Sequence, residues 1–462
     1  MSDHLTRKKV LVALGAAAAS GPYLFTTRVE AANESLDAYH HANIDWQQAK
    51  GETITVAVIP AGYFNNMIAL TPQFEALTGI KVNYQKIPPL EIRAKAVLDF
   101  TSKTGNFSTH TGDPAYFPLF VANKWIEPLD QYLHNPKYTD AKWYDFQDIF
   151  AAWRKSVQLE GKLWGLPSDG ETTFQIYRKD IYEKKKLKPA GTLAEFVHNA
   201  QVANDPANHV YGAAMRGFRG AGQNVYIWSS LFLEFGGQWF KNGRPAINSP
   251  AAVEALEWYV NVMTKYAPPG VQNWNWPDIA DAFSQGSVAL YIDSSTSAMV
   301  AVDPAKSKVV GEVAAARWPV GPTGKRAASL WAWQMPINVS ISQRAKLATW
   351  FYIQWMSCKE TQVRTSYAFD GSYKRLGVNR LSVMNSNGFR RLAATVDNWL
   401  PVTLETFAHD IPADYHPPIP QWPAFGDTLA TAIQTALVGQ AKPQDALNNA
   451  QTAVAAIMHG RG

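Results

Sequence analysis

The sequence predicts an α/β protein whose two lobes share one chain. Three observations carry this prediction: strand and helix patterns alternate along the whole length, no low-complexity linker separates independent domains, and no short-period repeat is present. The 462 residues suffice for two large lobes, and 47% hydrophobic against 18% charged residues is typical of a globular chain with a large core.

The first β-α-β unit is expected near the N-terminus. Residues 52–60, ETITVAVIP, alternate β-branched side chains and predict a buried strand. The following elements are then expected in order: a loop at 62–66, a helix at 68–78 that ends before Gly79, and a second strand at 80–84. This order favours a parallel sheet covered by helices.

The remaining elements follow from capping residues and periodicity. Thr192 and Glu195 form a capping-box pattern, and Ser249 with Pro250 predicts another helix start. Further elements are expected as short helices at 114–123 and 129–133, strands at 173–178 and 286–292, a helix at 343–355, and a helical tail at 428–458 broken near Pro443.

The N-terminus has the layout of a secretory signal peptide. Arg7, Lys8 and Lys9 precede a ten-residue apolar stretch at 10–19, and small residues up to Ala31 offer a cleavage site. The apolar stretch is too short to span a bilayer. We therefore expect residues 1–31 to be a signal peptide and the mature protein to reside in the periplasm.

Charge and cysteine content exclude several classes of protein. The 43 Lys and Arg residues against 38 Asp and Glu give a net charge of +5, and the basic residues are scattered, so no nucleic-acid partner is expected. Cys358 is the single cysteine, which excludes an intrachain disulfide and a cysteine-based zinc site. Catalytic and nucleotide-binding motifs are missing, so we expect no catalytic residues, no metal and no cofactor.

Two carboxylates and several tryptophans are the candidate chemical groups. Asp169 and Glu171 lie two residues apart, which fits a glycoside-hydrolase pair, a solvated turn, or acceptors for ligand hydroxyls; we favour the last of these for Glu171. Tryptophans stand in pairs in predicted loops and strands, and flat aromatic rings suit the C–H faces of sugars. The pairs are Trp274 with Trp276 and Trp331 with Trp333, and the second pair would share one face of a strand.

Several phrases, in a fixed order, resemble the carbohydrate-handling solute-binding proteins of bacterial ABC importers. The strongest is GKLWGLPSDGETTFQIYRKDIYEKKKLKPAGTLAEF at 161–196. Others are FEALTGIKV at 74–82, ANKWIEPLDQYL at 122–133, and WPVGPTGKRAASLWAWQMPINV at 318–339. Two positions depart from the family's pattern. Lys124 stands where the family usually has glycine, and Val378 stands where it has proline, in the later phrase YKRLGVNRLS at 373–382.

The resemblance implies a type II periplasmic-binding-protein fold. Two discontinuous lobes, joined at a hinge by three crossing strands, would close on a ligand in the interlobe cleft. Their expected bounds are 44–168 with 332–378 for lobe 1, and 169–331 with 379–462 for lobe 2. The implied function is capture of a small carbohydrate, such as a polyol or monosaccharide, and its delivery to the transmembrane permease subunits. We expect a monomer.

The resemblance and the residue patterns together give a set of ligand-binding candidates: Tyr63, Asp113, Tyr116, Glu171, Gln223, Trp228, Trp274, Trp276, Asp293, Trp331, Trp333 and Arg375. Three alternatives stay open. An oligosaccharide could fill several tryptophan subsites, and a secreted hydrolase could use Asp169 or Glu171. An acidic ligand could instead be bound by arginines, namely Arg216, Arg219, Arg375 and Arg380.

Overall fold

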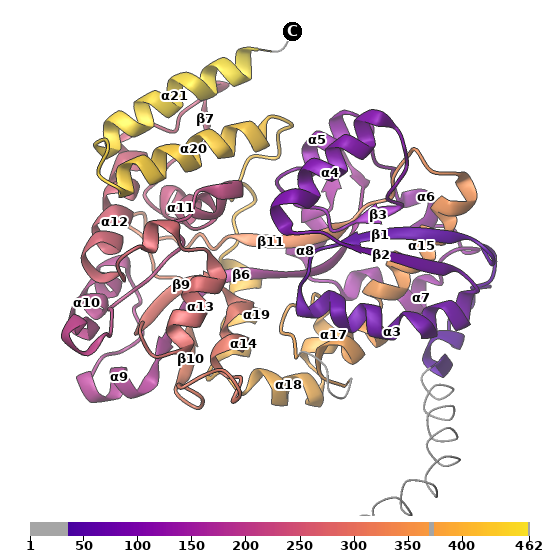
Figure 1. Cartoon of the computed structure of the whole chain (residues 1–462), viewed down its shortest axis with the longest axis horizontal. Coiled ribbons are helices and arrows are strands. Elements are labelled where there is room, and N and C mark those ends of the chain that lie inside the picture. Colours follow the sequence, from indigo (N-terminus) through magenta and orange to yellow (C-terminus); the bar gives the residue numbers. More distant parts are fainter. Residues whose placement is uncertain (1–35, 369–373, 461–462) are drawn as a thin grey trace, which may run out of the picture.

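A parallel three-stranded sheet lies at the centre of one half of the molecule, and a long antiparallel strand leads from it into the other half (Figure 1). The computed structural model describes residues 36–368 and 374–460, so the predicted signal peptide at 1–31 lies outside the described residues. The strands are β1 (Thr53–Val58), β2 (Lys81–Lys86), β3 (Thr109–His110), β4 (Gln158–Leu159), β5 (Lys162–Leu163), β6 (Leu166–Arg178), β7 (Phe240–Lys241), β8 (Arg244–Pro245), β9 (Leu290–Ser294), β10 (Val313–Ala316) and β11 (Leu330–Met335).

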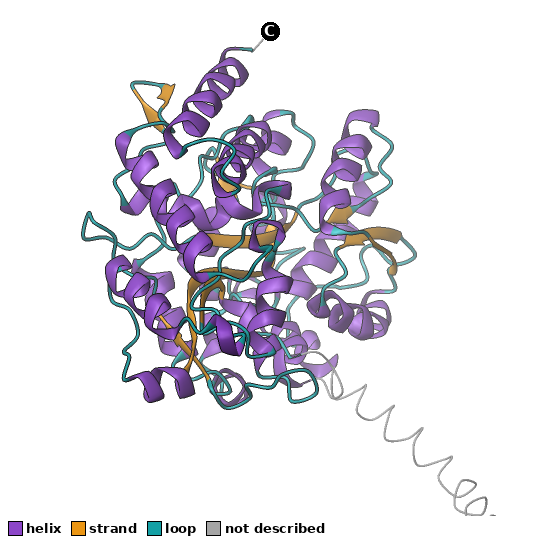
Figure 2. Cartoon of the chain, turned by 60° about the vertical axis from the view of Figure 1, so that its left-hand side comes forward, coloured by secondary structure: helices purple, strands orange, loops and turns teal. Residues whose placement is uncertain are grey.

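Helices surround both halves, as Figure 2 shows. The helices of the first half, including those just before the crossing strand β6, are α3 (Gly62–Thr78), α4 (Pro89–Ser102), α5 (Phe117–Ala122), α6 (Asp130–Leu133), α7 (Ala141–Tyr144), α8 (Ala151–Ser156), α15 (Gln343–Ser357) and α16 (Lys359–Val363). The others are α9 (Lys179–Lys185), α10 (Leu193–Ala203), α11 (Gln223–Glu234), α12 (Pro250–Tyr266), α13 (Trp276–Ser284), α14 (Ala298–Ala301), α17 (Leu381–Met384), α18 (Asn387–Ala393), α19 (Trp399–His409), α20 (Trp422–Leu437) and α21 (Pro443–His459).

The predicted parallel sheet is present. β1 pairs in parallel with β2 on one side and with β3 on the other, which gives the order β2-β1-β3. Helix α3 connects β1 to β2, as expected for a β-α-β unit. The loop prediction for residues 62–66 was wrong, because α3 already begins at Gly62 and buries Tyr63, Phe64 and Met67. Burial of this apolar stripe outweighs the weak helix propensity of the intervening asparagines.

Strand β6 links the two halves. Its first part pairs antiparallel with β11, and its last residues pair antiparallel with β9 and β10. Figure 1 shows β6 and β11 running side by side between the halves. The resemblance predicted three crossing strands. In the described chain the third connection, residues 374–379, is irregular and carries no strand.

The hydrophobic core divides in the same way. The largest cluster draws on residues between Ala190 and Val454, and a second draws on residues between Tyr39 and Cys358. Helix starts agree with the sequence prediction: Thr192 and Glu195 form a capping box, and the Ser249 hydroxyl accepts a hydrogen bond from the Ala252 backbone. The tail is helical and breaks before Pro443, as predicted.

Glu234, at the end of α11, gives a test of the packing around the largest core cluster. The side chain is fully buried and accepts hydrogen bonds from Trp318 Nε1 at 2.8 Å and from the Ala327 backbone at 3.0 Å. Burial raises the pKa of Glu234 to about 9, although both hydrogen bonds lower it. The carboxyl is therefore neutral in the folded protein at pH 7, whereas it ionises in the unfolded chain.

Because the folded pKa lies above the unfolded one, the stability that neutral Glu234 contributes is complete below about pH 4.5 and is lost as pH rises towards 9. We expect Glu234→Gln, which stays neutral at every pH, to remove this loss. Urea unfolding should show wild type losing on the order of 1 kcal/mol per pH unit relative to the variant between these limits. Parallel stability curves for the two proteins would contradict the expectation.

Candidate ligand-binding site

The β6–β11 ladder places two carboxylates opposite two tryptophans. In the register of the pair, Glu171 faces Trp331 and Asp169 faces Trp333. Residues two apart on a strand point to the same side, and directly opposed residues share a side. Asp169, Glu171, Trp331 and Trp333 therefore form one polar–aromatic surface at the connection between the halves. The two indole rings meet edge to face, with centroids 5.8 Å apart.

The opposite side of the same ladder requires small residues. Gly170 and Ala332 face away from the carboxylates, and Ala332 packs in a cluster with Trp153 and Leu330. A Cβ atom on Gly170 would lie 2.1 Å from the Trp331 carbonyl oxygen and 2.4 Å from the Trp153 ring. Glycine at this position lets β6 approach both β11 and the indole of α8 closely.

Arg216 holds the carboxylates of the second half. Its Nε lies 2.9 Å from Asp293 Oδ1 and its Nη2 lies 2.5 Å from the same oxygen, while its Nη1 donates to Gln223 Oε1 at 2.5 Å. Glu171 Oε1 lies farther from Nη2, at 3.8 Å, and Glu171 Oε2 accepts a hydrogen bond from the Thr296 hydroxyl at 3.1 Å. Burial raises the pKa of Glu171 above its ordinary value, against the opposing effect of Arg216.

Arg375 lies beside Asp169 at the other end of this surface. Its guanidinium lies 4.0 Å from the centre of the Tyr63 ring, and its Nη2 is 3.5 Å from Asp169 Oδ1. Burial raises the pKa of Asp169 to about 7; Arg375 lowers it, and Glu171 raises it further. Tyr63 is almost fully buried, and its hydroxyl has no hydrogen-bond partner among the described residues.

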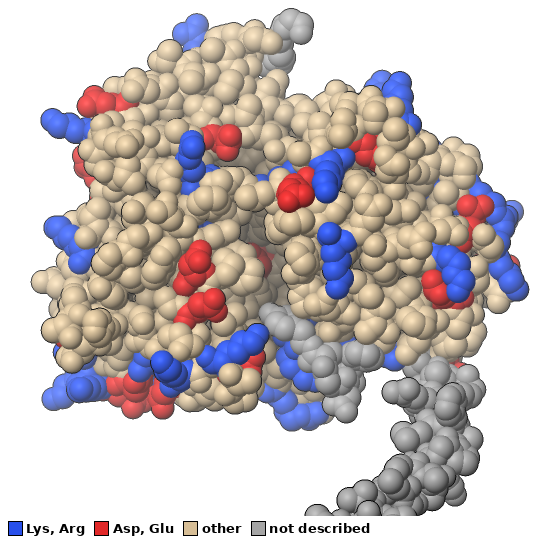
Figure 3. Space-filling view, viewed as in Figure 1, with Lys and Arg blue, Asp and Glu red and all other residues tan. Residues whose placement is uncertain are grey.

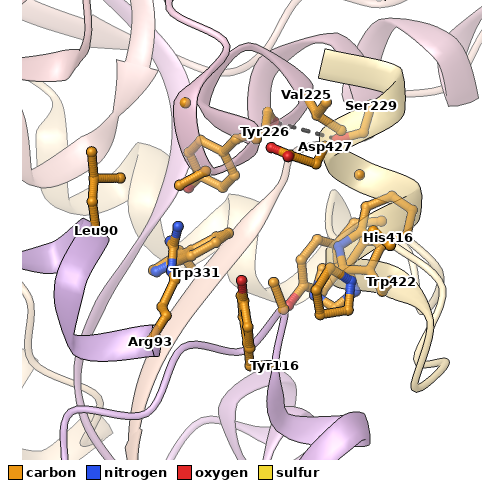
Figure 4. A pocket seen from close by; sticks show the side chains of 18 residues that line it. Leu90, Arg93, Tyr116, Val225, Tyr226, Ser229, Trp331, His416, Trp422 and Asp427 are labelled. Carbon is orange, nitrogen blue, oxygen red and sulfur yellow. Dashed lines mark hydrogen bonds between the residues drawn. The ribbon is translucent and has the colours of Figure 1, made fainter. Parts of the chain in front are cut away.

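A cavity of about 500 Å³ opens next to this surface, at the hollow between the halves in Figure 3. This volume is typical of small-molecule sites. Figure 4 shows Arg93 and Tyr116 pointing into it from the first half, and Tyr226 and Trp422 bounding it from the second, with Trp331 behind them. The lining residues are Leu90, Arg93, Ala115, Tyr116, Gly220, Ala221, Gly222, Val225, Tyr226, Ser229, Trp331, Tyr415, His416, Trp422, Pro423, Ala424, Gly426 and Asp427.

The cavity continues into the β6–β11 surface through an aromatic contact. Tyr226 meets Trp331 edge to face at 5.4 Å, and the Arg216 guanidinium lies 4.6 Å from the centre of the Tyr226 ring. On the other wall, Arg93 forms a buried ion pair with Asp113 and lies 5.8 Å from the centre of the Tyr116 ring. Carboxylates, guanidiniums and aromatic faces thus converge between the two halves.

The structure brings most of the predicted residues together but separates three tryptophans from the cavity. Those that lie at the cavity or in the contiguous ion-pair and aromatic contacts are Tyr63, Asp113, Tyr116, Glu171, Gln223, Asp293, Trp331, Trp333 and Arg375. Trp228 is fully buried and stacks on Phe232, so it packs in the core. Trp274 is half-buried against the same core, and Trp276 is 42% exposed at the start of α13. Neither belongs to the cavity lining.

The sequence prediction missed part of the wall. Arg93 and Tyr226 lie on helices, whereas the prediction sought ligand contacts mainly in loops and on the strand that carries Trp331 and Trp333. Tyr415, His416 and Trp422 follow α19, in the proline-rich stretch DYHPPIPQW, and His416 stacks on Trp422 at 5.6 Å. Burial lowers the pKa of His416 to about 4, so the ring is neutral at pH 7. The aromatic residues between the prolines of this stretch were the sequence signal that could have predicted this part of the wall.

Among residues 36–368 and 374–460, no group of three or more His, Cys, Asp or Glu residues is placed to hold a metal ion. Within the same ranges no helix combines the length and the hydropathy needed to cross a membrane.

Two of the arginines considered for an acidic ligand contact protein groups instead. Arg216 donates to Asp293 and Gln223, and Arg380 is buried beside Asp148 and Tyr144. The site is therefore built of paired charges and aromatic surfaces.

Comparison with known proteins identifies the family. Residues 25–363 match the bacterial extracellular solute-binding proteins. An erythritol/L-threitol-binding protein of Mycolicibacterium smegmatis is 26% identical over 82% of this chain and 85% of its own length. A mannitol-binding protein of Pseudomonas aeruginosa is 26% identical over 89% of this chain and 94% of its own.

Solved structures agree with the family and the fold. A solute-binding protein of an Agrobacterium radiobacter ABC transporter, in complex with ribitol, has a TM-score of 0.77, with 29% identity over 88% of this chain and 98% of its own. One from Agrobacterium vitis, with bound D-mannitol, has a TM-score of 0.78, with 26% identity over 89% and 99%. These findings confirm the predicted type II two-lobe fold and the prediction of a binding protein rather than an enzyme, and nothing in them supports the hydrolase alternative. The chain belongs to the bacterial extracellular solute-binding proteins, the family that supplies ABC importers with their solutes.

Proposed function

We propose that this protein captures a small polyol between its two halves and delivers it to the permease of an ABC importer. The observation that carries the proposal is the pairing of Glu171 with Trp331 and of Asp169 with Trp333 across the β6–β11 ladder. Carboxylate oxygens accept hydrogen bonds from vicinal hydroxyls, while the indole faces cover the C–H groups of the carbon chain.

The cavity and the relatives support the same ligand class. A volume of about 500 Å³ and a wall with both aromatic and ionised side chains suit a small hydroxylated ligand. The similar proteins named above bind erythritol, L-threitol, mannitol or ribitol. Approach of the two halves would then bury the ligand and present a changed outer surface to the permease.

The cellular setting is part of the proposal. We infer export to the periplasm through the signal peptide at 1–31, because a charged start, a short apolar stretch and small residues precede Ala32. Terminal sequencing of protein recovered from the periplasm should then begin at Ala32. We also propose that the mature protein is a monomer, which size-exclusion chromatography with light scattering tests directly.

The binding test is a thermal-shift screen of the mature protein against D-mannitol, ribitol, erythritol and maltose. A polyol at about 100 times its Kd should stabilise the fold by about 2.7 kcal/mol, which raises the melting temperature measurably. Trp331→Ala and Glu171→Ala should each weaken polyol binding about thirtyfold or more, the effect of removing about 2 kcal/mol at a central contact.

Trp276→Ala is the matched control, since the same substitution at an exposed tryptophan outside the cavity lining should leave the affinity unchanged. Stabilisation by maltose with no response to polyols would contradict the polyol proposal in favour of an oligosaccharide. Equal effects of Trp276→Ala and Trp331→Ala would contradict the placement of the site.

A further inference from the structure

The arginines around the site are each neutralised by a carboxylate of the protein. Arg93 pairs with Asp113, Arg216 with Asp293, and Arg375 lies beside Asp169. Arg375 also donates to two backbone carbonyls, those of Gly377 at 2.7 Å and Ser168 at 3.2 Å. Each of these guanidiniums therefore has a protein carboxylate beside it that balances its charge, and the Nε atoms of Arg93 and Arg375, which have no hydrogen-bond partner among the described residues, are buried.

Glu171 is the carboxylate left over from this pairing. The Nε and Nη2 atoms of Arg216 face Asp293 and its Nη1 faces Gln223, so Glu171 Oε1 stands 3.8 Å from Nη2, beyond hydrogen-bond distance. The side chain of Glu171 is 19% exposed and lies opposite Trp331. One negative charge of the β6–β11 surface is thus only partly compensated.

The cavity wall adds a second negative charge. Among the described residues that line the cavity, Arg93 and Asp427 are the Lys, Arg, Asp or Glu residues. Because Arg93 forms an ion pair with Asp113, the charge of Asp427 is the one that has no counterion in the lining. Asp427 lies on α20, at the edge of the cavity in Figure 4. Arg219 adjoins the lining residue Gly220, but it is exposed, where solvent screens its charge, and it donates to the Thr431 hydroxyl.

A site with more carboxylates than cations, partly shielded from water, disfavours a negatively charged ligand and favours a positively charged one. An added carboxylate would face Glu171 and Asp427, while the charges of the nearby arginines are already balanced by protein carboxylates, and like charges brought together in a binding site repel each other. A protonated amine would instead form charge-assisted hydrogen bonds with the same oxygens. The pKa of Glu171 and the pKa of Asp169 are both raised, mainly by burial, so the site holds protons more tightly than free carboxylates do.

We propose that this site selects ligands by charge: it excludes polyols that carry a carboxylate and accepts polyols that end in a protonated amine at least as well as neutral ones. The inference rests on the proposed function, which places a polyol against the β6–β11 surface. It goes further by assigning Glu171 and Asp427 as the residues that set the permitted charge, and it removes the acidic ligand from the alternatives.

Four ligands with one carbon skeleton test the proposal by isothermal titration of the mature protein at pH 7.5: D-mannitol, 1-amino-1-deoxy-D-mannitol, D-mannonate and D-mannonamide. The amide is the neutral counterpart of the acid and controls for the size of the terminal group. We expect mannonate to bind at least tenfold more weakly than mannonamide, and the amine to bind at least as tightly as mannitol. Equal affinities for mannonate and mannonamide, or an amine tenfold weaker than mannitol, would overturn the proposal.

Glu171→Gln assigns the effect to one residue, because it removes the charge and keeps the shape. The ratio of amine to mannonate affinity should fall several-fold in this variant, whereas Glu257→Gln, the same change at an exposed site on α12, should leave it unchanged. An unchanged ratio in Glu171→Gln would overturn the role of Glu171.

The outcomes separate this inference from the proposed function. If mannitol binds, and mannonate and mannonamide bind with equal affinity, the charge selection is contradicted and the polyol proposal stands. Binding of the amine alone, with no response to mannitol, ribitol or erythritol, would support the charge selection and contradict the polyol proposal. Binding of none of these ligands would overturn both.

Discussion

Arg216→Ala is expected to lower the free energy of unfolding by about 3–5 kcal/mol, since it leaves a buried carboxylate without its counterion. Asp293 is fully buried and receives Arg216 Nε at 2.9 Å and Nη2 at 2.5 Å, while Arg216 itself is 4% exposed. Loss of the guanidinium also removes the partner of Gln223 and the cation that lies 4.6 Å from the Tyr226 ring centre. Polyol binding should be lost together with stability.

Two further variants separate these effects. Arg219→Ala removes an arginine three residues away that is exposed and donates to Thr431, and it should change the unfolding free energy by less than about 0.5 kcal/mol. The double replacement Arg216→Met with Asp293→Leu removes both charges and should recover most of the stability, but not ligand binding. Urea unfolding and titration with mannitol measure the two properties. A double variant that binds mannitol like wild type would contradict the role of this pair in the site.

Gly170→Ala is expected to destabilise the fold by about 3 kcal/mol or more, because the new methyl group has no space on either side. Its Cβ would lie 2.1 Å from the Trp331 carbonyl oxygen and 2.4 Å from the Trp153 ring. The obstacle on one side is strand backbone, which cannot turn away as a flexible side chain would. Since Asp169 and Glu171 flank Gly170, displacement of β6 should also disturb the binding surface.

Gly426→Ala is the contrasting variant for stability. Gly426 lies inside α20, and its added Cβ would meet only ordinary contacts at 3.6 Å or more with the Trp422 ring. Alanine in a helix interior is favoured over glycine by up to about 1 kcal/mol, so this variant should melt higher in the absence of ligand. Equal melting temperatures for Gly170→Ala and wild type would show that β6 and β11 do not approach as closely as described.

The sequence predicted the elements that depend on local signals. The capping residues Thr192 and Ser249 and the first β-α-β unit were recognisable because caps and hydrophobic periodicity act over a few residues. Trp331 and Trp333 were predicted to share one face for the same reason. Their position opposite Glu171 and Asp169 joins segments 160 residues apart in sequence, and no local pattern encodes the register of such a pair.

The sequence did not predict which tryptophans pack in the core and which line the cavity. Trp228 and Trp276 were both predicted ligand contacts, yet one is buried in the core and the other is exposed. Which side of a helix meets the core is decided by the elements packed against it, and Trp228 shares its core cluster with Leu256 of α12 and Phe425 of α20. The wall formed by Tyr415, His416 and Trp422 escaped prediction because it comes from a proline-rich connection that only the tertiary fold places beside Trp331.

The most direct test of polyol binding at the β6–β11 surface is a crystal structure of the mature protein with D-mannitol. The ligand is expected to lie between the halves, with its hydroxyls on Glu171 and Asp169 and its carbon chain against Trp331. A ligand bound elsewhere, with the β6–β11 surface untouched, would contradict the central claim. So would a structure grown at a saturating mannitol concentration in which this surface holds no ligand.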